Sequence, residues 1–568
     1  MNSGPVPARF PSDRLSLLTV LLVACAYYLL VFNRGFSAVD EGHCLLLVEL
    51  FRKGFLPYRD FYFQHTPLSF WFQAMLFEIF GPALIVNRIY NLVQSLLLIW
   101  LFWAISRNLA APPYRVIPPV IFIGFSLGFA PWNNYAVDSV FVDFLTLGAL
   151  LRFCRTRRLA WLFTAGLLAG ICFCIHQNSG GAAAFLTIFA VLLVVKERGR
   201  HAPWLGLAGS LAAGLIAPLL VLIVFARDGL ALEFLQAAFL AGGTKSWVWR
   251  QIPRLILPAL ALFGLYLGMM ILAVQQIFRR PTRPAWGWLA SLVLLHLAGL
   301  AAILAFQKGP VALTAASLLT PFGLAALALY ALRSDRGLDP GQRRAVLLSA
   351  VFVIGMMVFG TLSGFDFGHN LLYGVWSLVL VGYLAERVVC AVPESWRSKT
   401  RWALAGATAT ALLSGVALNL NNPLPPLSVE PLYQQTLPLN LSRARGLRVS
   451  PLLKEEAEGI VGTVQRETRP EDPIFVFPVG GIYYFLSDRQ SGTYWTFLFF
   501  ENFSRQDQPL LIEQIERAKI PLVIVTDPEG SLGSLLYIRE IQQVYGYILD
   551  HYQPGERYGR YRIYRRKP

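Results

Sequence analysis

Long apolar runs recur along this chain, and they limit what it can fold into. About thirteen of them approach the roughly 20 residues that an α-helix needs to cross a bilayer. They lie near residues 15–33, 84–106, 114–131, 137–152, 159–176, 180–195, 203–226, 254–277, 285–306, 310–332, 345–363, 371–391 and 402–419. A mean hydropathy of +0.52 with 14% charged residues excludes a string of soluble domains. The sequence predicts a polytopic α-helical membrane protein.

Basic residues indicate how these spans are oriented. They cluster in every second connection, counting the N-terminus first, and the positive-inside rule makes those connections cytoplasmic. The clusters are Arg9 with Arg14, Arg107 with Arg115, and residues 152–158, 196–200, 279–283, 333–344 and 397–401. In the inner or plasma membrane, this pattern predicts a cytoplasmic N-terminus and an extracytoplasmic C-terminal segment. The net charge of +16 belongs to that topology, and we expect no nucleic-acid partner.

The first apolar run and the cysteines each have a simple interpretation. The run from Leu15 to Phe32 is longer than the roughly 7 to 15 residues of a signal-peptide core, so we interpret it as a membrane anchor. The six cysteines lie mostly inside apolar runs and lack the paired spacing of zinc or disulfide frameworks. We expect them to be small buried hydrophobes.

The chain changes character near residue 420. Polar residues return and prolines cluster in "NNPLPPLSVEP", which predicts a linker between a membrane domain (1–419) and an extracytoplasmic domain (420–568). "PIFVFP" and "PLVIVTD" are typical of buried strands, and residues 451–468 and 506–518 have helical periodicity. We predict a small α/β domain with a structural or acceptor-positioning role. The pair Gly480-Gly481 is too little to indicate nucleotide binding.

The first outer loop, residues 34–83, begins with an acidic pair. Asp40 and Glu41 in "SAVDEGHC" follow the first span by about eight residues, which places them at the outer mouth of the bundle. There they avoid the large free-energy cost of a carboxylate at the centre of the bilayer. The rest of the loop combines charges with many aromatic residues, which predicts helices lying in the membrane interface. The alternative for the pair is a solvated loop with a helix-capping acid.

Other outer segments also carry isolated polar groups at the ends of apolar helices. Polar groups at one depth on several helices suggest a common cavity. They are Asp138 in "NNYAVDS", His176, Gln177 and Asn178 in "CIHQNSGG", and Asp366 and His369 in "GFDFGHN". Each has a plainer alternative, since such a residue can also cap a helix, end it, or satisfy a backbone carbonyl.

The order of these motifs resembles the GT-C glycosyltransferases that use polyprenyl-phosphate sugars, including lipid A aminoarabinose transferase and the protein mannosyltransferases. "DEG" is followed by "LPYRDFYFQHTPL" and then by "FGPALIVNRIYNLV" at the second span. "YAVDSVFVDF" and "GICFCIHQNSGG" resemble the start of the family's fourth span and the end of its fifth. The positions that match the family pattern are Asp40, Glu41, Pro67, Leu68 and Arg88.

The sequence departs from that family at two positions. His176 stands where a lysine is common, and Gln64-His65-Thr66 precedes Pro67 where the aminoarabinose transferase has a Glu-Lys pair. The resemblance therefore transfers no metal ligand to Gln64.

The resemblance implies sugar transfer, with inversion, from a polyprenyl-phosphate donor to a cell-envelope acceptor beside membrane lipid. Asp40 would act as general base, and Glu41 would orient it or bind a metal. Candidates for the donor phosphate are Arg59, Arg88, His176, Lys245, Arg250 and His369, with His65 as a further cation. Asp138, Gln177 and Asp366 would line the substrate pocket. Asp40, Glu41 and His65 are the ligands expected for a divalent Mg, Mn or Zn ion.

Several alternatives remain open. Arg59 and Arg88 are equally consistent with side chains that snorkel to the membrane interface. Residues 228–254, with Gly242-Gly243 and two tryptophans, suit either a loop that orders over the donor or an amphipathic interface helix. Polar residues at helix ends also suit a transporter or flippase of lipid-linked glycan, although transporter sites lie nearer the midplane of the membrane. A non-catalytic lipid-binding or assembly protein is the remaining class.

Overall fold

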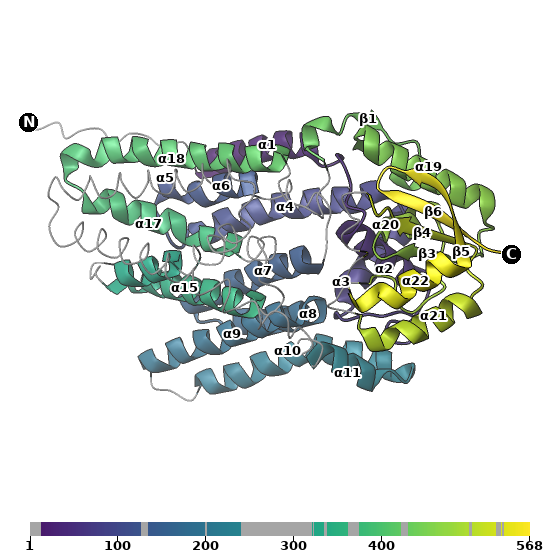
Figure 1. Cartoon of the computed structure of the whole chain (residues 1–568). Helices are drawn as coiled ribbons and strands as arrows, with labels where there is room; N and C mark the ends of the chain where they lie inside the picture. Colours follow the sequence, from purple (N-terminus) through teal and green to yellow (C-terminus); the bar gives the residue numbers. More distant parts are fainter. Residues whose placement is uncertain are drawn as a thin grey trace, which may run out of the picture.

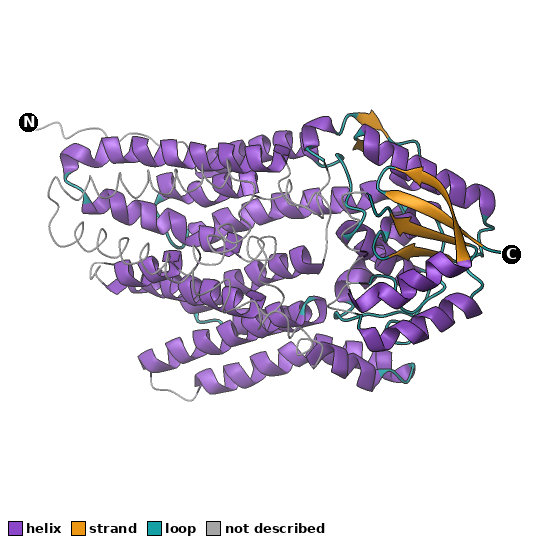
Figure 2. Ribbon diagram, viewed as in Figure 1, coloured by secondary structure: helices purple, strands orange, loops and turns teal. Residues whose placement is uncertain are grey.

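Long helices run side by side through most of the molecule, and a small β-sheet with its own helices covers one end of them (Figures 1 and 2). The computed structural model describes residues 13–125, 135–198, 202–239, 321, 323–333, 338–361, 374–421, 430–498, 503–529, 536 and 539–568. The bundle contains α1 (Asp13–Val31), α4 (Leu84–Ser106), α5 (Pro112–Arg115), α6 (Ile117–Phe125), α7 (Tyr135–Thr156), α8 (Leu159–Ile175), α9 (Gln177–Arg198), α10 (Ala202–Arg227), α11 (Ala231–Phe239), α15 (Pro340–Thr361), α17 (Leu378–Ala391) and α18 (Glu394–Asn421).

Six helices in the described ranges are long and apolar enough to cross a membrane. They are Asp13–Val31, Leu84–Ser106, Gln177–Val194, Trp204–Arg227, Pro340–Phe359 and Glu394–Asn421, with shorter apolar helices at Leu68–Phe80, Leu159–Ile175 and Gly323–Arg333. The runs predicted near 254–277 and 285–306 lie outside the described residues. The helical membrane architecture is thus confirmed, and the count of thirteen spans stays a prediction.

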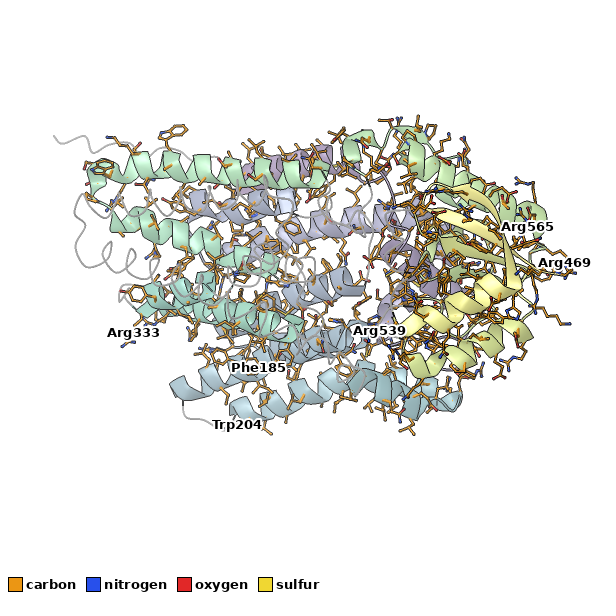
Figure 3. The ribbon with its side chains drawn as sticks, viewed as in Figure 1. Phe185, Trp204, Arg333, Arg469, Arg539 and Arg565 are labelled. Carbon is orange, nitrogen blue, oxygen red and sulfur yellow. The ribbon has the colours of Figure 1, made fainter. Side chains whose placement is uncertain are left out.

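Side chains on the outside of the bundle are apolar, and charged side chains gather toward its ends. Trp204 and Phe185 are each 48% exposed on adjacent helices. In Figure 3 both lie along the length of the bundle, whereas Arg333 lies at one end and Arg469 and Arg565 lie on the sheet domain at the other. An apolar belt between two charged ends is the surface that a bilayer requires.

Small residues allow two of these helices to pack closely. A Cβ added to Gly166 would overlap the backbone of Ser210, and one added to Gly170 would overlap that of Gly214, so α8 and α10 touch through their main chains. Close backbone approach at small residues is typical of helices that pack inside a membrane, where lipid tails remove the hydrophobic drive for association.

The C-terminal segment forms a four-stranded sheet of β3 (Ile474–Phe477), β4 (Leu522–Thr526), β5 (Tyr552–Tyr558) and β6 (Tyr561–Arg566). The order is β3-β4-β6-β5, with β3 and β4 parallel in the register Ile474↔Leu522 and the other pairs antiparallel. Around it lie α19 (Pro451–Glu467), α20 (Ile482–Ser487), α21 (Gln508–Arg517) and α22 (Gln542–His551), with a small pair β1 (Leu437–Pro438) and β2 (Arg448–Val449). The strands predicted in "PIFVFP" and "PLVIVTD" are confirmed as β3 and β4.

The first outer loop shares one hydrophobic core with this sheet domain. The loop contains α2 (Asp40–Arg52) and α3 (Leu68–Phe80), both confirmed as helices. Its apolar side chains pack in one cluster with α19, α20 and the sheet: Leu45, Leu46, Phe70 and Phe77 with Ile460, Val476, Ile482, Phe485 and Ile524. The loop is therefore wedged between the bundle and the sheet domain, as Figure 1 shows for α2 and α3.

Candidate functional site

The acidic pair Asp40-Glu41 opens α2, and its two carboxylates have different surroundings. Asp40 is partly exposed, whereas Glu41 is only 1% exposed. The backbone N–H of Asp40 donates to Ser37 Oγ at 3.2 Å, which ties the helix start to the preceding chain. A carboxylate in the first turn of a helix is stabilised by the helix dipole. Asp40 is therefore the accessible anion of the pair.

Glu41 forms a buried ion pair with Arg88 of α4. Arg88 Nε donates to Glu41 Oε1 at 2.9 Å and Arg88 Nη2 to Oε2 at 2.8 Å, the bidentate geometry of a strong pair. Arg88 also donates to the Gly35 carbonyl at 2.8 Å, and the Ser37 N–H donates to Glu41 Oε2 at 3.1 Å. With Arg88 0% exposed, this pair holds the chain entering α2 against the bundle.

Asp138, in the first turn of α7, is the centre of a polar network between three helices. Its Oδ1 accepts from Tyr90 Oη at 2.7 Å and from Gln94 Nε2 at 2.9 Å, both on α4. Its Oδ2 accepts from Ser69 Oγ on α3. Although only 4% exposed, the carboxylate is well satisfied by hydrogen bonds. It joins the first outer loop to the bundle.

The partners of Asp138 were missed by sequence analysis. Ser69 accepts from Gln73 Nε2 at 3.0 Å, and Gln73 Oε1 accepts from Asn87 Nδ2 at 2.8 Å, which extends the network toward Arg88. The sequence contains one usable signal, since polar residues recur at helical spacing in the second apolar run: Asn87, Asn91 and Gln94.

Two histidines predicted for the site both lie close to the ring of one tyrosine. The rings of His65 and Tyr135 have centroids 4.1 Å apart, and those of Tyr135 and His176 are 5.5 Å apart. His176 ends α8, and its Nδ1 lies 3.0 Å from Ser179 Oγ. Thr66, beside His65, donates to the carbonyl of Phe173 near the end of α8 at 2.9 Å. The structure thus brings His65 and His176 together.

Cys44 lies one turn after Asp40 on α2, and its side chain is buried. Burial raises the pKa of the Cys44 thiol. Three carboxylates raise that pKa further by their charge: Asp40, Glu41 and Asp138. That Asp40 and Asp138 belong to one site stays a prediction.

Of the remaining candidates, the structure describes Arg59 and Gln177. Arg59 is 56% exposed and pairs with Asp60 at 2.9 Å. Gln177 lies half-buried at the start of α9, and its Oε1 has no hydrogen-bond partner within the described ranges. The other four candidates lie outside the described residues: Lys245, Arg250, Asp366 and His369.

The described part of the chain contains no assembled metal site. Among the described residues, no three His, Cys, Asp or Glu side chains come together to hold a metal ion. Both oxygens of Glu41 are already occupied by Arg88, so the set expected from sequence, Asp40 with Glu41 and His65, is not assembled. We derive no catalytic step through a metal.

One family model matches part of the chain. Residues 64–222 match the family model described as dolichyl-phosphate-mannose-protein mannosyltransferase. This segment contains His65, Arg88, Asp138 and His176. No curated protein sequence gives a significant match.

Solved structures share the fold over nearly the whole chain. The archaeal oligosaccharyltransferase AglB from Archaeoglobus fulgidus, in complex with an inhibitory peptide and a dolichol-phosphate, matches with a TM-score of 0.53 and 12% identity over 98% of this chain and 74% of its own. ArnT from Cupriavidus metallidurans, bound to undecaprenyl phosphate, matches with a TM-score of 0.52 and 14% identity over 97% of each chain. An oligosaccharyltransferase from Archaeoglobus fulgidus in complex with Zn and sulfate also matches, with a TM-score of 0.52 and 14% identity over 96% of this chain and 73% of its own. The GT-C resemblance drawn from sequence is confirmed at the level of fold.

Proposed function

We propose that this GT-C-fold membrane protein is a glycosyltransferase that moves a sugar from a polyprenyl-phosphate donor to a cell-envelope acceptor on the outer face of the membrane. Two observations from the comparisons support this class. The family model matches the segment that carries His65, Arg88, Asp138 and His176, which follows the acidic pair. The structures with the same fold include one bound to a dolichol-phosphate and one bound to undecaprenyl phosphate.

The accessibility of Asp40 beside the locked Glu41 is the observation on which the mechanism rests. In the proposed reaction an acceptor hydroxyl attacks the anomeric carbon of the donor, the bond from that carbon to the phosphate oxygen breaks, and the configuration inverts. The hydroxyl proton passes to Asp40, and the polyprenyl phosphate leaves as an anion. A positioned carboxylate is a suitable general base for this step. Glu41 cannot act as the general base while both its oxygens accept hydrogen bonds from Arg88.

The departing phosphate needs positive charge or hydrogen-bond donors where its charge develops. We assign this role to His65 and His176, whose rings both lie close to Tyr135, and to the predicted Lys245, Arg250 and His369. The contacts of Arg88 with Glu41 and Gly35 occupy its guanidinium, so we assign it to positioning the loop rather than to the phosphate.

Asp138 is proposed to form a wall of the substrate pocket beside Asp40. Its hydrogen bonds with Ser69, Tyr90 and Gln94 hold α3 against α4 and α7. Fixed polar groups of this kind orient a sugar by hydrogen bonding, since little reorganisation is needed when the substrate binds.

Glycan profiling of a deletion strain tests the function. We expect the deletion to remove one sugar modification from an envelope lipid, glycan or protein and to leave its polyprenyl-phosphate donor in excess, because transfer is the step that consumes the donor. A plasmid copy of the chain should restore the modification. Donor that accumulates only on the cytoplasmic leaflet would contradict transfer and support a flippase.

A reporter fusion tests the topology on which the outer site depends. Alkaline phosphatase fused after Pro568 should be active, and a fluorescent protein that matures only in the cytoplasm should stay dark at the same position. A fusion in the Arg333–Arg344 connection should give the opposite result. Cytoplasmic reporter activity at Pro568 would place Asp40 on the wrong side for the proposed acceptor.

A further inference from the structure

The glycine that follows the acidic pair touches a glycine of the sheet domain. A Cβ added to Gly42 would overlap the backbone nitrogen of Ile482, and one added to Gly481 would lie 2.8 Å from the carbonyl carbon of Gly42. Real side chains essentially never approach a backbone so closely, so only glycine fits at either position without a shift. The first turn of α2 and the loop before α20 therefore meet main chain to main chain.

The loop before α20 also forms polar contacts with the start of α2. The N–H of Ile482 donates to the carbonyl of Ala38 at 3.4 Å, two residues before Asp40. Gly480 has φ +138°, a conformation that side chains rarely adopt, and it turns the chain after β3 toward α2. The pair Gly480-Gly481, which is too little to indicate nucleotide binding, thus packs against the backbone at the start of α2 in the first outer loop.

Three further backbone hydrogen bonds connect the loop to the sheet domain. Before α2, the Gly35 N–H donates to the Arg448 carbonyl at 2.8 Å, and the Arg448 N–H donates to Asn33 at 2.9 Å. After α2, the Tyr62 N–H donates to the Tyr494 carbonyl at 2.8 Å. The loop is held on both sides of Asp40.

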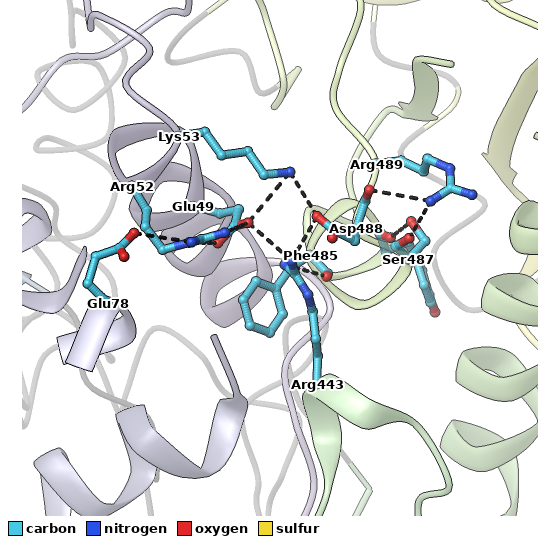
Figure 4. A network of polar contacts seen from close by, with 10 residues as sticks. Glu49, Arg52, Lys53, Glu78, Arg443, Phe485, Ser487, Asp488 and Arg489 are labelled. Carbon is cyan, nitrogen blue, oxygen red and sulfur yellow. Dashed lines mark hydrogen bonds and ion pairs between the residues drawn. The ribbon is translucent and has the colours of Figure 1, made fainter. Parts of the chain in front are cut away.

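An ion network connects the far end of α2 to the end of α20 (Figure 4). Asp488 pairs with Lys53 at 2.8 Å and with Arg443 at 2.7 Å, and Arg443 reaches Glu49 at 3.2 Å. Burial would raise the pKa of Asp488, but the hydrogen bond from Lys53 and the charge of Arg443 hold that pKa below its usual range. The carboxylate therefore stays ionised and keeps its two cations.

We propose that the sheet domain is a positioning element for Asp40, and that the Gly42·Gly481 contact is the point at which it sets the position of the first turn of α2. This inference rests on the proposed function, because it gives the domain a role in the same reaction. Gly42 and Gly481 are positioning residues and touch no substrate. A shift of about 1 Å in a reacting group is enough to slow an enzyme roughly 100-fold, so close backbone packing has a direct kinetic consequence.

Gly481→Ala is the primary test, with two readouts on the full chain in detergent or nanodiscs. Hydrogen exchange of the peptide covering residues 37–45 should become measurably faster, because the methyl group forces α20 away from α2 and releases the amides of the first turn. In a transfer assay, kcat should fall up to about 100-fold while KM for the donor changes little, because the donor pocket is untouched.

Gly546→Ala is the matched control. Gly546 lies on α22 of the same domain, and an added Cβ there meets nothing within 4 Å. This variant should change neither readout. Lys53→Met, which breaks one ion pair to Asp488 without a steric clash, should produce a weaker effect in the same direction as Gly481→Ala and covers the case in which the alanine variant does not fold.

The outcomes separate this inference from the proposed function. Unchanged exchange over residues 37–45 in both Gly481→Ala and Lys53→Met overturns the positioning role, even if the chain is a transferase. If exchange over residues 37–45 is faster in Gly481→Ala but even the wild-type chain transfers no sugar, the structural link stands and the proposed function is overturned. A rise in KM with kcat unchanged places the domain in acceptor or donor binding instead and also overturns positioning.

Discussion

Asp40→Asn should lower kcat for sugar transfer by about 10²–10⁴-fold, the usual contribution of a general base. The amide has nearly the same shape as the carboxylate but cannot accept the hydroxyl proton. Glu41 cannot replace it, because both its oxygens are hydrogen-bonded to Arg88. Turnover of a polyprenyl-phosphate sugar by the purified variant measures the effect.

A donor-binding measurement shows whether Asp40→Asn has lost only its general base or has also lost the structure of the binding site. Asp40→Asn should bind undecaprenyl phosphate as tightly as the wild type, since the phosphate is assigned to other residues. Glu513→Gln, at an exposed position on α21, is the control and should retain full transfer. If Asp40→Asn retains wild-type kcat, the general-base assignment is wrong.

Arg88→Met should destabilise the folded chain by about 3–5 kcal/mol, because it leaves the Glu41 carboxyl buried without its ionic partner. Glu41 is 1% exposed, so water cannot replace the lost guanidinium. The variant also removes the hydrogen bond to the Gly35 carbonyl, which ties the start of the outer loop to α4. A large drop in the thermal unfolding midpoint in detergent is the expected result.

A double variant tests whether the unpaired charge is the cause. Glu41→Leu combined with Arg88→Met removes both charges and should recover much of the lost stability, as apolar replacements of buried ion pairs often do. Arg469→Met is the control, since that side chain is 74% exposed and its pair with Asp472 is a surface pair of little worth. If the single and double variants lose the same free energy of unfolding, the unpaired Glu41 is not the cause of the instability.

Much of the bundle could be predicted from local sequence. The run predicted at 84–106 is the helix Leu84–Ser106, because hydropathy depends on residues close in the chain. The acidic pair and the aromatic-rich helices of the first outer loop could also be predicted, because they too are recognised from neighbouring residues in the chain. The pairing of Arg88 with Glu41 was not, since it joins residues 47 positions apart whose meeting depends on how α2 crosses α4.

The same limit applies to the polar network of Asp138. The sequence identified Asp138 and His176 as unusual for their depth, but the partners Ser69, Tyr90 and Gln94 were indistinguishable from ordinary polar residues at helix surfaces. Only the packing of α3, α4 and α7 aims these side chains at one carboxylate. Arg59 is the opposite case, a plausible phosphate ligand by residue type whose side chain is exposed and paired with Asp60.

By itself, the sequence determined that the chain is a helical membrane protein, that strands and helices follow its spans, and that an acidic pair opens the first outer loop. Hydrophobic transfer energy and backbone periodicity are local properties, so a sequence shows them directly. Only the tertiary structure decided that Glu41 is locked by Arg88 while Asp40 stays accessible, and that Gly481 packs against Gly42. Those outcomes depend on which distant segments come together and on distances of a few ångströms between them.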